Sequence, residues 1–357
     1  MSFSKSKSGL CLGDFAKVID NKKVALYILK NSGGSELTVT NFGAKIVTLL
    51  VPDREGKLVD IVLGLPNMAD YRNAKEPYFG GICGRTANRI AHGEFVLEGK
   101  KYSLAQNNGA NSLHGGVKGF NAVVWEVLEK SDKHIKMYYL SPDGEEGYPG
   151  NLEVWLTYSF TDKNELMIDY SAKTDKTTIV NLTNHSFFNL SGEGDANIGD
   201  HLLQLNADYY LPTDEGAIPL GHLESVKNTP FDFTKLRSIG ERIDEDNEQL
   251  KIGRGYDHCF VLNKASENEY SYVGYCQSPK TGIRMDMFTS EPGVQIYTGN
   301  WLDGSYVAKA GHRYPARSAV CFEMQHYPDA INQKDFPSII LRPNETFESK
   351  TAYKFTT

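Results

Sequence analysis

The chain has 357 residues, of which 40% are hydrophobic and 23% charged, and this is the composition of a globular protein long enough to bury a large core. Its formal net charge is −7 with both signs interspersed, which excludes a basic stripe for nucleic acid or a cationic patch for an anionic membrane. We therefore expect the partner to be a small neutral molecule or another protein.

The strand signals, in chain order, are a strand pair at 35–52, a hairpin at 93–104, and apolar or alternating runs at 134–140, 151–160, 165–174 and 177–188. The hairpin should turn at Glu98 and Gly99. Turn residues separate the last four runs, which predicts a meander of antiparallel strands.

Helical periodicity is limited to two short segments, 67–74 and 233–243. There is no strand–helix alternation of the kind that builds a parallel sheet. The sequence therefore predicts an all-β fold, a large antiparallel β-sandwich with a few short helices, as one domain over residues 1–357. On the concave face of such a sheet, every second side chain of distant segments can converge.

The cysteine pattern favours a reduced, cytoplasmic setting. The five cysteines are odd in number and form no C-x-x-C pair. The first 15 residues contain no apolar run long enough for a signal peptide, and no window approaches the ~20 apolar residues of a membrane helix. Glycosylation signals begin at Asn181, Asn184 and Asn189, but we expect them to stay unused because glycosylation needs the secretory route.

Polar side chains concentrate in six segments, at 84–95, 111–116, 181–192, 255–260, 291–302 and 320–332. Within the third segment, His185 shares a predicted strand face with Asn181, Thr183 and Phe187. Such a face is costly in a core unless a polar ligand is present. The alternative is a strand histidine that bonds Asn184 or Thr183.

Four further residues are candidates for the same pocket. Glu323 lies in an otherwise apolar strand, where burial would raise its basicity as a general base requires; alternatively it points to solvent. His114 precedes paired glycines and could instead cap its own turn. Arg89 could be a surface cation paired with Glu94, and Asp257 could simply form a turn.

Together these segments resemble the galactose mutarotase (aldose 1-epimerase) family, in the same order and over about residues 41–342. The matching motifs are NRIA-x-G-x-F (88–95), NSLHGG (111–116), T-N-H-x-x-F-N-L (183–190), YDH (256–258), E-P-G-x-Q-x-Y-T-x-N (291–300) and the late glutamate strand around Glu323. No departure occurs at the matched functional positions.

The resemblance implies a single-domain galactose-mutarotase-like supersandwich with an open sugar cleft. It implies an isomerase of hexose metabolism that interconverts the α and β anomers of free aldohexoses such as D-galactose and D-glucose, without metal or organic cofactor. The enzyme would bind its sugar but no nucleic acid or membrane, as a monomer or homodimer. By motif, Glu323 matches the general base and His185 the general acid, and the positions that hold the sugar match Asn88, Arg89, His114, Asp257 and Gln295.

This chemistry suits the residue types. Opening the hemiacetal moves one proton off the C1 hydroxyl and another onto the ring oxygen, which a carboxylate and an imidazolium can do together. Four alternatives remain open: a glycoside hydrolase with Asp257 and Glu323 as its carboxylate pair, a sugar-binding sensor without chemistry, a metal site of His114, His185 and Glu323, and an epimerase of phosphorylated hexoses, which would need extra cations.

Overall fold

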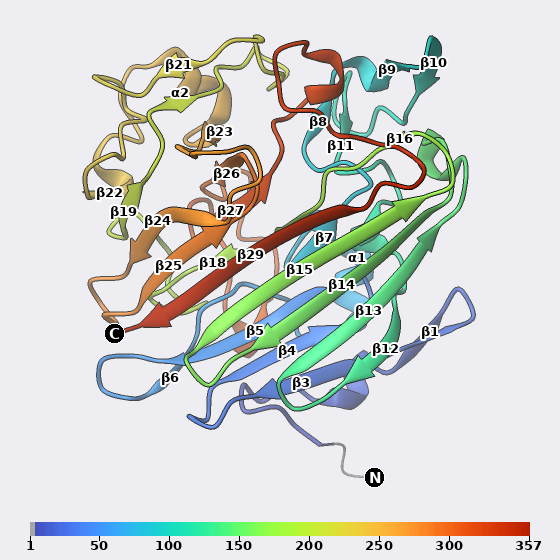
Figure 1. The fold of residues 1–357 in the computed structure, drawn as a ribbon. Coiled ribbons are helices and arrows are strands. Elements are labelled where there is room, and N and C mark those ends of the chain that lie inside the picture. The colour runs from blue at the N-terminus through green and yellow to red at the C-terminus, as the bar shows by residue number, and fades with distance from the viewer. Residues whose placement is uncertain (1–3) are drawn as a thin grey trace.

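The largest unit is a nine-stranded antiparallel sheet, whose strands β13, β14, β15 and β29 run diagonally across Figure 1. In spatial order the strands are β12 (Glu126–Lys130), β13 (His134–Ser141), β14 (Leu152–Phe160), β15 (Glu165–Thr174), β29 (Phe347–Thr356), β25 (Arg284–Thr289), β24 (Ser271–Gln277), β19 (Leu202–Leu205) and β22 (Arg237–Ser238). The consecutive pairing of β13, β14 and β15 confirms the predicted meander. The computed structural model describes residues 4–357. The first three residues of the expected domain lie outside the described residues. They also begin the segment in which we expect no signal peptide.

Two smaller sheets complete the layers. The six-stranded sheet comprises β18 (Phe187–Phe188), β27 (Val320–Gln325), β26 (Gly293–Tyr297), β23 (Asp257–Val261), β20 (Tyr209–Tyr210) and β21 (Glu224–Ser225). The four-stranded sheet comprises β3 (Leu26–Lys30), β4 (Glu36–Thr40), β5 (Lys45–Pro52) and β6 (Leu58–Asp60). The antiparallel pairing of β4 with β5 confirms the strand pair predicted at 35–52.

The remaining ladders of the described residues have two strands each. They join β1 (Lys17–Ile19) with β2 (Lys22–Val24), β7 (Gly81–Cys83) with β17 (Thr183–His185), β8 (Arg89–Ile90) with β11 (Ser112–Leu113), β9 (Glu94–Leu97) with β10 (Lys100–Ser103), and β16 (Thr178–Ile179) with β28 (Ile340–Leu341). The β9–β10 ladder confirms the predicted hairpin, and its turn residues Glu98 and Gly99 both have positive φ.

The helices are few and short. Within the described residues, α-helix is limited to α1 (Met68–Asn73) and α2 (Glu248–Gly253), and short 3-10 turns lie at Leu12–Phe15, Ala91–Gly93, Phe120–Ala122, Glu145–Gly147, Ile239–Glu241, Lys309–Gly311 and Ala330–Asn332. α1 confirms the helix predicted at 67–74. The helix predicted at 233–243 is wrong, because β22 pairs with β19 at the edge of the large sheet and tertiary pairing overrides the local pattern. None of the helices in residues 4–357 has the length and apolar character needed to cross a membrane.

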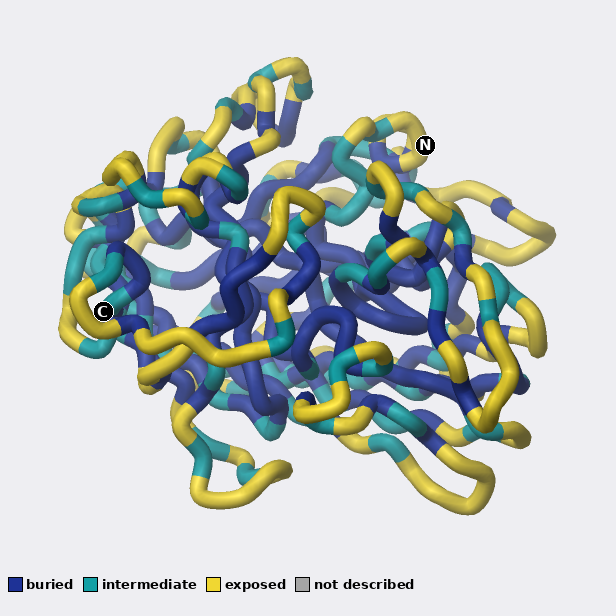
Figure 2. The backbone as a smooth tube through the Cα atoms, turned by 90° about the horizontal axis from the view of Figure 1, so that it is seen from above, coloured by how far each residue is buried: buried dark blue, intermediate teal, exposed yellow. Residues whose placement is uncertain are grey.

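The main hydrophobic core lies between the nine-stranded sheet and the two smaller sheets. Leu156 from β14, Val39 from β4 and Phe322 from β27 belong to the same buried cluster. Figure 2 shows buried backbone gathered in the centre of the molecule and exposed loops around its rim. The fold is therefore the predicted antiparallel sandwich.

Alternation along β27 positions the polar groups of this strand. Phe322 and Met324 enter the main core. Because successive side chains of a strand point to opposite faces, Cys321, Glu323 and Gln325 face the other way. Two polar side chains, those of Glu323 and Gln325, thus lie on one face of a strand whose residues are all buried.

The segment expected to continue the meander at 177–188 is instead broken into β16, β17 and β18, which pair with three different partners. Two asparagine side chains in and just after this segment bond carbonyl groups of other parts of the chain. The Asn184 amide donates to the Gly80 carbonyl, and the Asn189 amide donates to the Ser318 carbonyl. All three asparagines of the glycosylation signals are buried, so the folded chain does not present them for glycosylation.

A buried lysine ties the loop between β26 and β27 to the four-stranded sheet. Lys309 Nζ donates to the carbonyl oxygens of Val47 and Val62 at 2.7 and 2.8 Å and to Asp60 Oδ2 at 2.7 Å. The Lys309 and Asp60 side chains are only 4% and 14% exposed. All three ammonium protons are therefore satisfied inside the protein.

We expect Lys309→Met to lower the free energy of unfolding by about 3–5 kcal/mol, because it leaves the Asp60 carboxylate largely buried without its cation. Urea unfolding followed by circular dichroism measures the change. Lys118 pairs with Asp20 at the same 2.7 Å, but both side chains are more than half exposed. Lys118→Met should therefore cost no more than about 1 kcal/mol, and equal losses in the two variants would contradict the role assigned to Lys309.

Candidate active site

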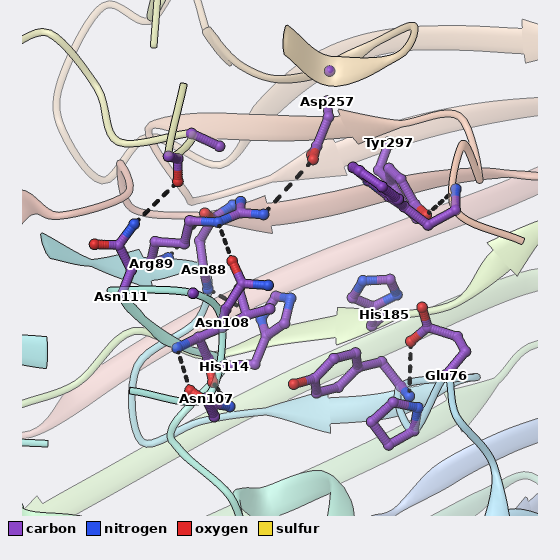
Figure 3. Close-up of a pocket in the computed structure, with 18 of the residues that line it drawn as sticks. Glu76, Asn88, Arg89, Asn107, Asn108, Asn111, His114, His185, Asp257 and Tyr297 are labelled. Carbon is purple, nitrogen blue, oxygen red and sulfur yellow. Dashed lines mark hydrogen bonds and ion pairs between the residues drawn. The ribbon is translucent and has the colours of Figure 1, made fainter. Parts of the chain in front are cut away.

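A cavity of about 730 Å³ is lined by residues from β8, β11, β17, β23, β26 and β27 and from the loops between them. Six of the seven residues that the sequence singled out line it: Asn88, Arg89, His114, His185, Asp257 and Glu323. Gln295 lies behind this surface, where its amide donates to Asp257 Oδ1 at 2.7 Å. The fold thus brings all seven candidates into one region, and Figure 3 shows several of them around the cavity.

The register of β27 brings His185 next to Glu323. β18 pairs Phe187 with Cys321 in antiparallel order. His185 lies two residues before Phe187 and Glu323 two residues after Cys321, so their side chains face each other. The distance from His185 Nε2 to Glu323 Oε1 is 3.5 Å, and the side chains are 5% and 2% exposed. The alternative that Glu323 points to solvent is therefore wrong.

The second ring nitrogen of His185 faces the core side of the site. His185 Nδ1 lies 3.6 Å from Cys321 Sγ. The alternative that His185 bonds its neighbours is also wrong, because the Asn184 amide donates to Gly80 and Tyr158, and among residues 4–357 the Thr183 hydroxyl has no hydrogen-bond partner. His185 therefore keeps Nε2 available to the cavity.

Burial shifts the pKa values of His185 and Glu323 in opposite directions. It lowers the pKa of His185 to about 3, an effect to which the positive charge of Lys45 adds. It raises the pKa of Glu323 well above its ordinary value, and the negative charge of Asp257 adds to this while Arg89 opposes it. The two shifts have opposite directions, so burial favours the uncharged form of each group, an unprotonated His185 and a protonated Glu323.

His114 is fixed by two hydrogen bonds with Asn88. The Asn88 N–H donates to His114 Nδ1 at 3.1 Å, and the His114 N–H donates to the Asn88 carbonyl at 2.9 Å. Both residues have positive φ, of 59° and 51°, which is uncommon outside glycine and is typical of functional sites. The alternative that His114 only caps its own turn is wrong, because its ring bonds a separate strand segment.

This hydrogen bond also decides what His114 can do chemically. Since Nδ1 accepts the Asn88 N–H, the proton of the neutral imidazole is on Nε2, and burial lowers the pKa of His114 well below its ordinary value. His114, His185 and Glu323 each offer a potential ligand atom within 4.8 Å of the others. A ligating ring nitrogen must carry no proton, and the other nitrogen normally donates to an acceptor. The bond from Asn88 makes His114 a hydrogen-bond donor at Nε2 and disfavours the metal-site alternative.

Arg89 and Asp257 form a polar network in the wall of the cavity, as Figure 3 shows. Arg89 Nε donates to Asn108 Oδ1 at 3.0 Å, and its Nη2 lies 4.0 Å from Asp257 Oδ2. The alternative pairing of Arg89 with Glu94 is wrong, because Glu94 pairs with Lys101. Asp257 is the first residue of β23 and joins this network, so it is more than a turn former. Burial raises the pKa of Asp257, while the charge of Arg89 opposes the rise.

The aromatic wall of the cavity was missed from the sequence. The Tyr78 ring lies 4.6 Å from the ring of His114 and is stacked 5.6 Å from that of His185, measured between centroids. A usable signal was the glycine pair that follows it, because a Cβ atom on Gly80 would meet the Ile46 carbonyl at 1.9 Å. The backbone must therefore pass closely here, and this fixes Tyr78 in the site.

The rim of the cavity carries an exposed indole. Trp301 lines the cavity and is 55% exposed. The Arg254 guanidinium lies 3.9 Å from the centre of its ring, and the backbone N–H of Trp301 donates to the Tyr297 hydroxyl. These contacts hold the indole at the entrance.

We expect His114 to remain a neutral imidazole with its proton on Nε2 from about pH 5 to pH 8. Burial lowers its pKa, so the ring gains a second proton only at a more acidic pH. Long-range ¹H–¹⁵N correlation spectra distinguish the two nitrogens, and the signals are assigned by their loss in His114→Gln. A signal that titrates near pH 6.5, or an unprotonated Nε2, would contradict this tautomer.

Comparisons with known proteins identify the family of the chain. The family model for aldose 1-epimerase matches residues 25–354. Galactose mutarotase from Bos taurus is 45% identical over 317 residues, which are 89% of this chain and 90% of the bovine protein. Aldose 1-epimerase from Escherichia coli (strain K12) is 33% identical over 338 residues, 94% and 96% of the two chains. The solved structure of an aldose epimerase homologue from C. elegans has a TM-score of 0.86 at 30% identity and covers 93% of this chain and 99% of its own.

Proposed function

The chain belongs to the aldose 1-epimerase family, and from that premise we propose that it interconverts the α and β anomers of free aldohexoses such as D-galactose and D-glucose. One observation carries the proposal. The His185 ring nitrogen and the Glu323 carboxylate oxygen lie 3.5 Å apart in a cavity of a volume typical for small-molecule sites.

In the proposed reaction, Glu323 accepts the proton of the C1 hydroxyl while His185 Nε2 donates a proton to the ring oxygen. The hemiacetal opens, the C1–C2 bond rotates, and the ring closes with the two roles reversed. Each transfer requires a hydrogen-bond reach of roughly 2.6–3.2 Å. Two proton-carrying atoms 3.5 Å apart can serve two oxygens bonded to the same carbon.

The assignment requires the ion-paired form of the couple, in which the shared proton has passed from Glu323 to His185. Burial favours the neutral form in the free protein, as the opposite pKa shifts of the two groups indicate. Both forms contain the same number of protons, so their balance changes only with the local field. A sugar hydroxyl that donates to the Glu323 carboxylate stabilises the ion-paired form.

The remaining residues hold the sugar. The Arg89 guanidinium donates to sugar oxygens, and Asp257 accepts from two adjacent hydroxyls. Gln295 orients the Asp257 carboxylate through its 2.7 Å hydrogen bond. His114 donates from Nε2 to the ring oxygen or a neighbouring hydroxyl, and Asn88 fixes the His114 ring. These clamps leave C1 free to turn.

We further propose that the chain works as a single domain over residues 1–357, as a monomer or homodimer, in cytoplasmic hexose metabolism without nucleic-acid or membrane partners. One core cluster that extends from Leu29 to Phe355 supports the single domain. All five cysteines are free, which fits a reducing compartment.

Replacing Glu323 by Gln should reduce kcat by about 10²–10⁴-fold, because an amide cannot accept the proton, and His185→Gln should do the same through loss of the acid. KM should change little because Arg89 and Asp257 remain. Polarimetry of freshly dissolved α-D-glucose or α-D-galactose, with the spontaneous rate subtracted, measures the effect.

The matched control is a second buried carboxylate–imidazole pair. Glu291 Oε2 lies 2.6 Å from His326 Nδ1, with side chains 2% and 12% exposed, and neither residue lines the cavity. Glu291→Gln should keep the wild-type kcat. A wild-type rate in Glu323→Gln or His185→Gln would refute the acid–base assignment.

The pH dependence of kcat/KM should reflect the single proton shared by the pair. The acid limb appears where the pair takes up a second proton, and since burial lowers the pKa of His185 to about 3, activity should persist at about pH 5. The alkaline limb appears where the last proton leaves, and the raised pKa of Glu323 moves it upward. Initial rates after a pH jump measure both limbs. An acid limb near pH 6.5 would show an ordinary imidazole and contradict the model of a shared proton.

A further inference from the structure

A second polar residue occupies the same face of β27 as Glu323. Gln325 follows it by two positions, so the two side chains point the same way about 7 Å apart along the strand. Gln325 is fully buried, although glutamine is mostly found at protein surfaces. Its neighbours on the strand, Phe322 and Met324, point to the opposite face and into the main core.

Thr183 faces Gln325 from the neighbouring chain segment. β17 contacts β27, and extending the register of the Phe187–Cys321 pair along both segments puts Thr183 level with Gln325, as it puts His185 level with Glu323. One step further, the Asn181 side chain accepts the His326 N–H and donates to the His326 carbonyl, so the two segments stay together past this point.

Three side chains on these two segments carry buried polar atoms without partners in the described part of the chain. Within residues 4–357, the Gln325 Oε1 and Nε2 atoms, Thr183 Oγ1 and Glu323 Oε2 are all buried and make no hydrogen bond to the protein. Buried polar groups are almost always paired, with protein or with internal water. Internal waters typically make about three hydrogen bonds to groups of this kind. A carboxylate, an amide and a hydroxyl on one face supply that number.

We propose that Gln325 and Thr183 bind a buried water molecule that donates a hydrogen bond to Glu323 Oε2. The proposal rests on the proposed role of Glu323 as the base and makes Gln325 and Thr183 positioning residues. The bound water holds Glu323 Oε2 at the back of the site and directs Oε1 toward His185 and the sugar. Its hydrogen bond also stabilises the ionised carboxylate that accepts the substrate proton.

The surroundings of Glu323 contain many ionisable groups, and uncharged substitutions at Gln325 and Thr183 leave all of them in place. They are Glu76 and Tyr78 in the loop before β7, Cys83 on β7, Arg89 on β8, His114, His185 on β17, Asp257 and Cys259 on β23, Cys321 on β27 and Tyr353 on β29. A change in the pH profile of such a variant therefore reports the lost hydrogen bond.

The test uses Gln325→Met, which keeps an unbranched side chain of similar length, and Thr183→Val, which keeps the shape of threonine. We expect kcat to fall by about 10- to 100-fold in Gln325→Met, the range produced by loss of one hydrogen bond to a charged group. KM should change less than about 3-fold, because the sugar clamps remain. The alkaline limb of kcat/KM should move to higher pH, since the carboxylate loses a donor that favours its ionised form. Thr183→Val should show the same changes to a smaller extent.

The control is Ser318→Ala, which removes another buried hydroxyl that has no partner within residues 4–357 but does not line the cavity. It should keep the wild-type kcat and pH profile. Wild-type kcat and pH profile in folded Gln325→Met and Thr183→Val would overturn the proposal.

A high-resolution crystal structure of the wild-type protein gives a test independent of activity and of the folding of any variant. We expect a water within about 3.2 Å of Glu323 Oε2 and of the Gln325 amide. A direct bond between these two side chains, or a dry contact, would overturn the inference. Neither result would contradict the proposed function, because that function is tested by the Glu323→Gln and His185→Gln variants.

Discussion

The site depends on one constraint, the period of two along β27. The strand directs Phe322 and Met324 into the core and Glu323 to the opposite face, so the residues that anchor the strand are direct chain neighbours of the residue that lines the cavity. The ladder to β18 then sets which residue faces Glu323. A slip of one residue would turn Glu323 into the core and Phe322 into the cavity, and hydrophobic burial opposes that slip strongly. Packing energy thereby fixes the position of Glu323 in the wall of the cavity.

Burial serves the chemistry as well as the fold. The apolar strand that carries Glu323 removes water from the His185–Glu323 pair and shifts the two pKa values in opposite directions. In water the two groups would form a simple ion pair with separate titrations. Inside this sheet burial favours the uncharged form of each group, and the polar groups around them modify that balance. The same low polarity makes each nearby hydrogen-bond donor count for more.

The fold could be read from the sequence wherever local pattern and tertiary pairing agree. The strands at 134–140, 151–160 and 165–174 alternate cleanly because each has one buried face, and they pair with their sequence neighbours. The helix at 233–243 failed because β22 is only two residues long and is held by a partner distant in the chain. The break within 177–188 was equally invisible, since β16, β17 and β18 each pair with a strand that is remote in the chain.

The polar members of the site were predictable because a charged or amide side chain is conspicuous in an apolar strand. The aromatic Tyr78 was not, because it resembles an ordinary core residue until its neighbours are known. The hydrogen bond that sets the tautomer of His114 was also beyond the sequence. It requires the left-handed backbone of both Asn88 and His114, and a motif does not reveal that pairing.

The indole at the entrance of the cavity has an optical consequence. The chain contains three tryptophans. Trp125 is sealed in the core, and Trp155 lies on the nine-stranded sheet away from the cavity, so Trp301 alone of the three borders it. A ligand that displaces solvent from this ring alters the polarity that governs its emission. Trp301 is therefore an intrinsic fluorophore at the entrance of the cavity, and ligand occupancy can be followed by tryptophan fluorescence in the unlabelled protein.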